Sequence, residues 1–297
     1  MRIIAIFSLA LAVVAPLPGQ TRREVEKPGG VQVLESPSGV RFALLGEAGE
    51  RPAPTILVFG GGMRSGLEGR SAKMCRILAR HGFLAVALDS PCHGEDQRSG
   101  EPFGLAGWRH RLEKGEEFLA DFLKQTSSVL NHLIRQRVTD PERIVAFGPS
   151  RGGFLALHFA AVEPRVGTVV AFAPVTDLLA LREFQGTADK AAARSLDVMA
   201  LAPKLAGRRL FIQMGHNDMR VGGHHAIDFA LNLMKRSPDQ MKPLQGIWSG
   251  DAIKLVITPS ENPNGHTTYD GAHHDAADWI LRSGEKTGPE ESSCESE

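Results

Sequence analysis

A serine with the surroundings of a nucleophile stands at position 150, in the segment GPSRGG. The segment matches the pattern G-x-S-x-G, follows a short apolar run (RIVAF) and precedes an apolar helical segment. In such a strand–turn–helix setting the serine backbone is strained, so the residues two positions before and after it must be small. Gly148 and Gly152 meet this requirement. We therefore predict that Ser150 is a nucleophile, in preference to a plain glycine-rich turn.

A base and an acid must accompany the serine, because its hydroxyl is a weak nucleophile until its proton is removed. In proteins with this type of turn the chain order is serine, acid, histidine. Asp218 follows the apolar run RLFIQM, and His266 follows the run KLVIT. Both stand at the carboxyl ends of predicted strands, where open α/β sheets bind their ligands. We predict that Asp218 orients His266 and that His266 activates Ser150.

Other residues compete for these two roles. Asp177 also follows a predicted strand and is an alternative acid, although we favour a role in capping the segment that comes after it. His273 and His274 are alternative bases, but we interpret them as solvated residues on the face of the last helix. His266 is preferred because a loop at a strand end can reach the serine more directly.

An oxyanion site is predicted from the glycines that follow the run TILVF. Acyl transfer passes through an oxyanion that backbone N–H groups must meet, one from the residue after the nucleophile and one from a glycine-rich loop. These rules indicate Arg151 and Gly61, with Gly62 as the next candidate. A phosphate-binding loop is the rival interpretation, but the Lys-Ser/Thr ending and the spacing G-x-G-x-x-G are both missing.

The remaining histidines and cysteines give no pattern of metal ligands, so we expect neither a metal nor a cofactor. We interpret His93, in the segment DSPCHG, as a structural hydrogen-bonding residue. An odd number of cysteines leaves at least one thiol free or intermolecular if the protein is exported. A disulfide between Cys75 and Cys92 is possible, but the sequence alone does not show it, and the third cysteine is Cys294.

A regular alternation of apolar strands and helices predicts an α/β protein with a doubly wound, mostly parallel sheet and helices on both faces. The strands are continuous apolar runs, as expected when helices cover both faces of a sheet. Residues 178–207 interrupt the alternation and are expected to form a small helical cap. Strands are predicted at 31–34, 40–45, 55–59, 83–88, 143–147, 166–172, 209–214 and 254–258, and helices at 71–81, 112–137, 153–162, 225–235 and 270–281.

The ends of the chain differ from its centre in composition. Residues 1–19 combine an early arginine, a short apolar run and small residues, which predicts a secretory signal peptide and a secreted or periplasmic protein. An uncleaved membrane anchor is the alternative, although the run is short for a transmembrane helix. Residues 20–30 are interpreted as a leader, and the acidic segment 283–297 is expected to be disordered. The formal net charge is zero, which argues against a nucleic-acid partner.

The motifs together resemble the α/β-hydrolase superfamily, and within it the dienelactone hydrolase and prolyl-oligopeptidase branch. The resemblance covers roughly residues 31–282 and depends on FGGGM, DSPCHG, GPSRGG, AFAPVTD, GHNDMRV and the final Gly-His. It implies the same three residues, Ser150, Asp218 and His266, as the catalytic set. Many relatives have His-Gly where this chain has Phe59-Gly60, and no propeller domain precedes the hydrolase segment. The second departure favours an esterase over a dedicated peptidase.

The sequence therefore predicts a secreted serine hydrolase that cleaves small carboxylic esters, of short acyl or acetylated-sugar type, through an acyl-enzyme. A small serine peptidase or amidase with the same residues is the first alternative. A binding protein that kept the fold without the chemistry is the second, because fold alone does not determine function. The sequence does not indicate the acyl or alcohol group of the substrate, and it does not indicate an oligomeric state.

Overall fold

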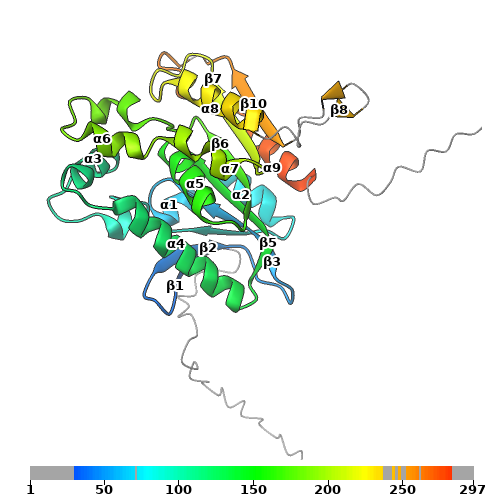
Figure 1. The fold of residues 1–297 in the computed structure, drawn as a ribbon. Helices are drawn as coiled ribbons and strands as arrows, with labels where there is room; N and C mark the ends of the chain where they lie inside the picture. Colours follow the sequence, from blue (N-terminus) through cyan, green and yellow to red (C-terminus); the bar gives the residue numbers. More distant parts are fainter. Residues whose placement is uncertain are drawn as a thin grey trace, which may run out of the picture.

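An eight-stranded sheet forms the centre of the computed structural model, which describes residues 30–70, 72–236, 243–244, 247–248, 252–260 and 262–282 (Figure 1). The strand order is β1-β2-β4-β3-β5-β6-β7-β10. The pairs β1–β2 and β2–β4 are antiparallel, and every other pair is parallel. The strands span β1 Gln32–Glu35, β2 Arg41–Leu45, β3 Ala53–Val58, β4 Leu84–Ala87, β5 Thr139–Pro149, β6 Val166–Phe172, β7 Arg209–Gly215 and β10 Ile253–Thr258, and two-residue strands β8 (Pro243–Leu244) and β9 (Ile247–Trp248) form a separate pair.

Helices cover both faces of this sheet, as Figure 1 shows, and each face has its own apolar core. On one face the buried residues come from α1 (Met63–Glu68), α2 (Ala72–Ala79) and α9 (Ala272–Arg282). On the other face they come from α3 (Leu105–Glu113), α4 (Phe118–Arg135), α5 (Arg151–Val162), α7 (Ala202–Leu205) and α8 (Gly223–Arg236), and from the short helices of the segment 178–201. The predicted α/β-hydrolase fold, with a mostly parallel sheet between two helical layers, is confirmed.

Strand order places the predicted site near the middle of the sheet. β5 lies between β3 and β6, and Phe147 near its carboxyl end pairs with Val58 on one side and Val170 on the other. β6 pairs with β7, and β7 pairs with β10. Because these strands are parallel, the loops after β3, β5, β7 and β10 leave the same edge of the sheet.

The predicted helix over 112–137 is wrong in one respect, because the chain forms two helices there. α3 ends at Glu113 and α4 begins at Phe118, and Gly115 between them has φ +71°. A glycine adopts this left-handed conformation at little cost, and it commonly terminates a helix. The amphipathic pattern continues across the break, which is why the periodicity alone predicts a single helix.

The segment 178–207 folds into five short helical pieces, η2 (Leu178–Ala180), η3 (Arg182–Phe184), α6 (Lys190–Ser195), η4 (Val198–Leu201) and α7. Three aspartates begin pieces of this cap, because Asp177, Asp189 and Asp197 each accept a hydrogen bond from a backbone N–H two or three residues later. This agrees with the small helical insertion that the sequence predicts.

The predicted signal peptide at 1–19, almost all of the leader at 20–30 and the acidic tail at 283–297 lie outside the described residues. Within the described residues, none of the helices has the length and apolar character needed to cross a bilayer. Cys75 and Cys92 are both buried and free, and Cys294 is outside the described part.

Candidate active site

Ser150 occupies a strained turn between β5 and α5, with φ +53° and ψ −119°. Side chains in neighbouring positions would not fit this turn. A Cβ atom on Gly148 would overlap the backbone of Gly152, and a Cβ atom on Gly152 would overlap the carbonyl group of Phe59. Both glycines are therefore required for the close approach of β5, α5 and the loop after β3, as the sequence predicts.

The structure brings Ser150, His266 and Asp218 together in one chain of hydrogen bonds. Ser150 Oγ lies 3.1 Å from His266 Nε2, and His266 Nδ1 lies 2.9 Å from Asp218 Oδ2. The Asp218 side chain is fully buried, whereas His266 is about one quarter exposed. An arrangement of this type can remove the serine proton, because the carboxylate holds the imidazole in the tautomer that leaves Nε2 free to accept.

Backbone contacts hold Asp218 and His266 in the positions in which their side chains meet. The backbone N–H groups of Arg220 and Val221 donate to Asp218 Oδ1 at 3.0 and 3.2 Å, which leaves Oδ2 for the histidine. Gly265, at φ +70°, precedes His266, and a Cβ atom there would overlap the backbone of Asn217. The loop after β10 therefore packs directly against the loop after β7, so the two residues meet although they are far apart in the sequence.

The loop after β3, which contains the predicted oxyanion residues Gly61 and Gly62, contacts the start of α5 through Phe59 and Gly60. Arg151 begins α5, and its Nε donates to the carbonyl oxygen of Gly60 at 2.8 Å. The loop is also fixed from the other side, because the N–H of Ser90 donates to the Gly61 carbonyl at 3.0 Å. Gly62 is the residue that precedes α1. Backbone N–H groups in such a loop and at the start of a helix can stabilise a developing oxyanion.

His93 lies beside this loop. Within the described residues it makes no hydrogen bond to Ser150. Its Nδ1 donates to the Pro91 carbonyl at 2.8 Å, and its ring lies against Phe103. Burial and the nearby Arg151 charge hold the pKa of His93 below its usual value. The interpretation of His93 as a structural hydrogen-bonding residue agrees with these contacts.

The alternative acid and bases lie in other environments. Asp177 accepts a hydrogen bond from the N–H of Leu179 at 2.8 Å and caps η2, as we favoured from the sequence. His274 is exposed on α9. The interpretation of His273 as a solvated residue is wrong, because it is buried against the rings of Phe147 and Phe172. The helix repeat alone could not show which of two adjacent histidines faces the sheet.

A cavity of about 340 Å³ opens beside the nucleophile. Its lining includes Ser150, His266 and apolar residues at the end of β6. Arg70, Asn262 and Thr268 also line it, and the sequence analysis missed all three. They come from loops without a recognisable motif, so only the fold identifies them.

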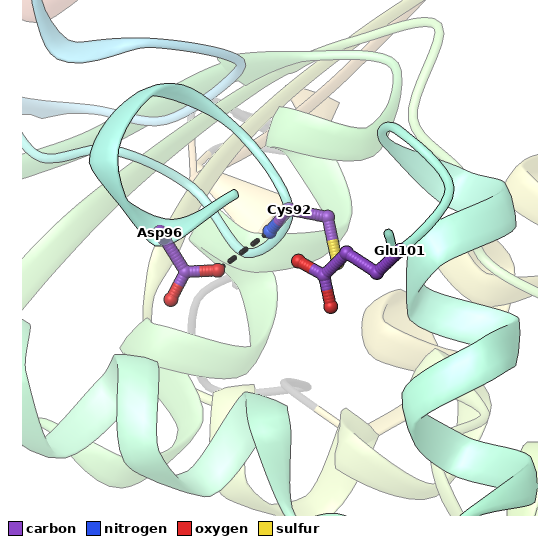
Figure 2. Close-up of side chains that lie close together, drawn as sticks. All are labelled: Cys92, Asp96 and Glu101. Atoms are coloured by element: carbon purple, nitrogen blue, oxygen red, sulfur yellow. Dashed lines mark hydrogen bonds between the residues drawn. The ribbon is translucent and has the colours of Figure 1, made fainter. Parts of the chain in front are cut away.

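A second cluster, shown in Figure 2, contains Cys92, Asp96 and Glu101, whose potential metal-ligating atoms lie within 4.8 Å of one another. The guanidinium of Arg111 is already bound to both carboxylates, at 2.6 Å from Asp96 Oδ2 and 2.6 Å from Glu101 Oε1. Burial raises the pKa of the Cys92 thiol to about 12, so the group that would ligate a metal is protonated. We interpret the cluster as a structural support for the loop that carries His93, held together by the ion pairs of Arg111.

The parallel sheet, the strained serine turn and the hydrogen-bonded histidine and aspartate define the α/β-hydrolase class. Comparison with family models gives a more specific result, because the model of the prolyl oligopeptidase family matches residues 72–244, more than half of the chain. The chain therefore belongs to the prolyl oligopeptidase family, and it is a serine hydrolase. The predicted resemblance to this branch is confirmed.

Solved structures share the fold at low sequence identity. Acetyl xylan esterase 1 from Thermoanaerobacterium sp. JW/SL YS485 is 18% identical, with a TM-score of 0.61 over 89% of this chain and 87% of that one. TT1662 from Thermus thermophilus is 18% identical, with a TM-score of 0.62 over 89% of this chain and 98% of that one. A cold-adapted esterase from an Arctic intertidal metagenomic library is 16% identical, with a TM-score of 0.60 over 90% and 99% of the two chains. No curated protein sequence matches the chain.

Proposed function

We propose that the protein is a carboxylic ester hydrolase in which Ser150, His266 and Asp218 act as nucleophile, general base and orienting acid. The observation that carries this proposal is the continuous hydrogen-bond chain from Ser150 Oγ through the imidazole to the buried Asp218 carboxylate. The substrate class is a small ester with a short acyl group, because the cavity beside the serine holds only about 340 Å³.

The first half of the reaction forms an acyl-enzyme. His266 Nε2 takes the Ser150 proton while Oγ attacks the ester carbonyl carbon, and the backbone N–H groups of Arg151 and Gly61, or Gly62, meet the resulting oxyanion. His266 then gives the proton to the leaving alkoxide, and the carbon–oxygen bond breaks. Asp218 stabilises the imidazolium throughout and keeps its own charge.

The second half releases the acid. Water loses a proton to His266 and attacks the acyl carbon, a second oxyanion forms in the same place, and Ser150 leaves as it regains the proton. No step needs a metal or an organic cofactor.

Replacement of the nucleophile tests the proposal. We expect Ser150→Ala to lower kcat for 4-nitrophenyl acetate by about 10⁴-fold or more, because the activated hydroxyl is lost. Ser195→Ala is the matched control, since Ser195 lies exposed on the cap, where its hydroxyl donates to the Ala192 carbonyl. Turnover by Ser150→Ala equal to that of the Ser195→Ala protein would refute the assignment.

A peptidase or amidase activity is the second candidate, because the family to which the chain belongs is named for an oligopeptidase. Matched ester and amide substrates with the same acyl group separate the two activities. A kcat/KM for the amide that equals or exceeds that for the ester would support the peptidase.

We further propose, from residues 1–19, that the protein is exported to the periplasm or the medium. N-terminal sequencing of the exported protein tests this, since a chain that still begins at Met1 would contradict cleavage. Its partners are small ester substrates; nothing in the balanced charge of the chain favours a nucleic acid.

A further inference from the structure

The cavity beside Ser150 has one charged side chain in its lining, and that charge is positive. Arg70 contributes it, from the segment between α1 and α2. Within the described residues the Arg70 guanidinium makes no ion pair and no hydrogen bond. No aspartate or glutamate of the described chain lines the cavity. An exposed arginine without a counter-ion is common on a surface, but here it stands at the wall of the cavity that contains the nucleophile.

The other polar groups in the lining add donors to this charge. Thr268 and the side-chain amide of Asn262 both line the cavity, and each carries a hydrogen-bond donor. His273 lies at the same wall, nine-tenths buried, and its Nδ1 has no hydrogen-bond partner within the described structure. The lining therefore presents one fixed cation and several donors around an apolar floor formed by Phe172 and Ala173.

The charges around His273 have the same sign. Burial, and after it the nearby charges of Lys73, His274 and Arg70, together lower the pKa of His273 to about 4. Lys73 Nζ donates to the backbone carbonyl of Asp270, so its charge also lacks a carboxylate partner among the contacts of the described residues. Asp275, two residues after His273 in the chain, accepts a hydrogen bond from the Tyr269 hydroxyl. The charges that act on His273, those of Lys73, His274 and Arg70, are therefore all positive.

We propose that this cavity binds a negatively charged group of the substrate, with Arg70 as the specificity-determining residue. The inference rests on the proposed ester hydrolase function and extends it from small esters to anionic ones. An anion in the cavity would gain a charge-assisted hydrogen bond from the guanidinium and neutral donors from Asn262 and Thr268. The substrates that fit are half-esters of short dicarboxylic acids, with the anion on the acyl side, or acyl esters of hydroxy acids, with the anion on the alcohol side.

Two pairs of substrates test the proposal and show whether the anion lies on the acyl side or on the alcohol side of the ester. Monoethyl succinate is compared with ethyl 4-methylpentanoate, in which a branched apolar end of similar shape replaces the carboxylate. O-Acetylglycolate is compared in the same way with isobutyl acetate. We expect kcat/KM to be at least about tenfold higher for the anionic member of one pair, the size of one charge-assisted hydrogen bond. Equal values within both pairs would overturn the proposal while leaving the ester hydrolase function intact.

Variants of Arg70 show whether this residue causes the preference. We expect Arg70→Gln to lower the ratio of kcat/KM for the anionic ester to kcat/KM for the neutral ester by about tenfold, because the charge that would pair with the anion is lost. Arg70→Lys keeps the charge and should restore part of the preference. Arg80→Gln is the matched control. Arg80 is an exposed arginine just after the end of α2, and it does not line the cavity. A preference that survives Arg70→Gln would refute the role of this residue.

An inhibition measurement makes the test independent of which ester the enzyme accepts. Succinate and inorganic phosphate are added separately to the hydrolysis of 4-nitrophenyl acetate, with neutral succinamide as the reference. We expect competitive inhibition by at least one of the two anions, weakened about tenfold by Arg70→Gln and by high salt, since an exposed charge is screened. Equal inhibition by succinate and succinamide, or none by either anion, would contradict an anion site. If the wild-type protein hydrolysed none of these esters, that result would instead refute the proposed ester hydrolase function.

Discussion

At the scale of single residues, the proposed chemistry depends on the buried carboxylate of Asp218, whose two oxygens have different partners. Asp218 uses one oxygen to accept two backbone N–H groups and the other to hold the imidazole of His266. We expect Asp218→Asn to lower kcat by about 10³- to 10⁴-fold with little loss of folded protein, because the amide favours the wrong tautomer of the histidine. Asp177→Asn is the control, since Asp177 caps the start of the helical insertion and lies 3.9 Å from His225 Nε2. Equal effects of the two substitutions on kcat would contradict the assignment.

The glycines around the serine offer a second test at this scale. A methyl group on Gly152 would overlap the Phe59 carbonyl, so we expect Gly152→Ala to lower the free energy of unfolding by about 1–3 kcal/mol or more and to impair activity. Gly167→Ala is the matched control, because a Cβ atom on Gly167 in β6 meets nothing within 4 Å. Urea denaturation measures both. A Gly152→Ala protein as stable and as active as the control would refute the close packing at this turn.

At the scale of the elements, the loop between β4 and α3 depends on one buried guanidinium. Arg111 is 2% exposed and contacts Asp96 and Glu101, and its hydrogen bonds hold the pKa of Glu101 at about 2. We expect Arg111→Met to lower the free energy of unfolding by about 3–5 kcal/mol, because it leaves the buried Glu101 carboxylate and the half-buried Asp96 carboxylate without their counter-ion. Arg98→Met removes an exposed pair with Glu116 and should cost at most about 1 kcal/mol. Equal losses from both substitutions in urea denaturation would contradict this account of the cluster.

The sequence predicted the elements of the sheet well, because a strand covered on both faces is a continuous apolar run that few other structures share. β6 has the predicted bounds, and the other seven strands of the sheet differ by a few residues at their ends. The break between α3 and α4 was missed because Gly115 ends a helix without ending its apolar pattern. The short helices of the cap could not be predicted, since each is too short to show a helical period.

Some residues of the candidate site could be predicted from the sequence, and others could not. Ser150, Asp218 and His266 stand in local motifs at strand ends, so their order along the chain and their places after strands were enough to predict that they meet. Arg70 and Thr268 reach the cavity through long-range packing of loops, and His273 faces the sheet because of how α9 lies. Such positions depend on tertiary structure, which no spacing in the chain encodes.

At the scale of the whole molecule, buried histidines make stability depend on pH. Burial lowers the pKa of His158 to about 4, and it also lowers the pKa values of His132 and His273. The unfolded chain, with histidine pKa values near 6.5, then binds more protons than the folded protein, so the free energy of unfolding falls as pH drops from 6.5 towards 4. We expect a loss of about 2 kcal/mol between pH 7 and pH 4.5 from His158 alone.

Urea denaturation at several pH values checks this dependence. His158 Nε2 donates to the Leu196 carbonyl at 3.0 Å, so His158→Gln keeps a donor and should flatten the curve. His81→Gln is the control, because His81 is exposed just beyond α2 and should leave the slope unchanged. A slope that is the same in all three proteins would show that His158 is not the group that titrates.

Covalent labelling with a fluorophosphonate tests the central claim most directly, because the reagent reacts with a serine only when a neighbouring base activates it. Mass spectrometry of the digested protein locates and counts the adduct. The account predicts one adduct per chain on the peptide that contains Ser150, none in Ser150→Ala, and much slower labelling in His266→Gln. An unlabelled wild-type protein, or an adduct on a different serine, would contradict it.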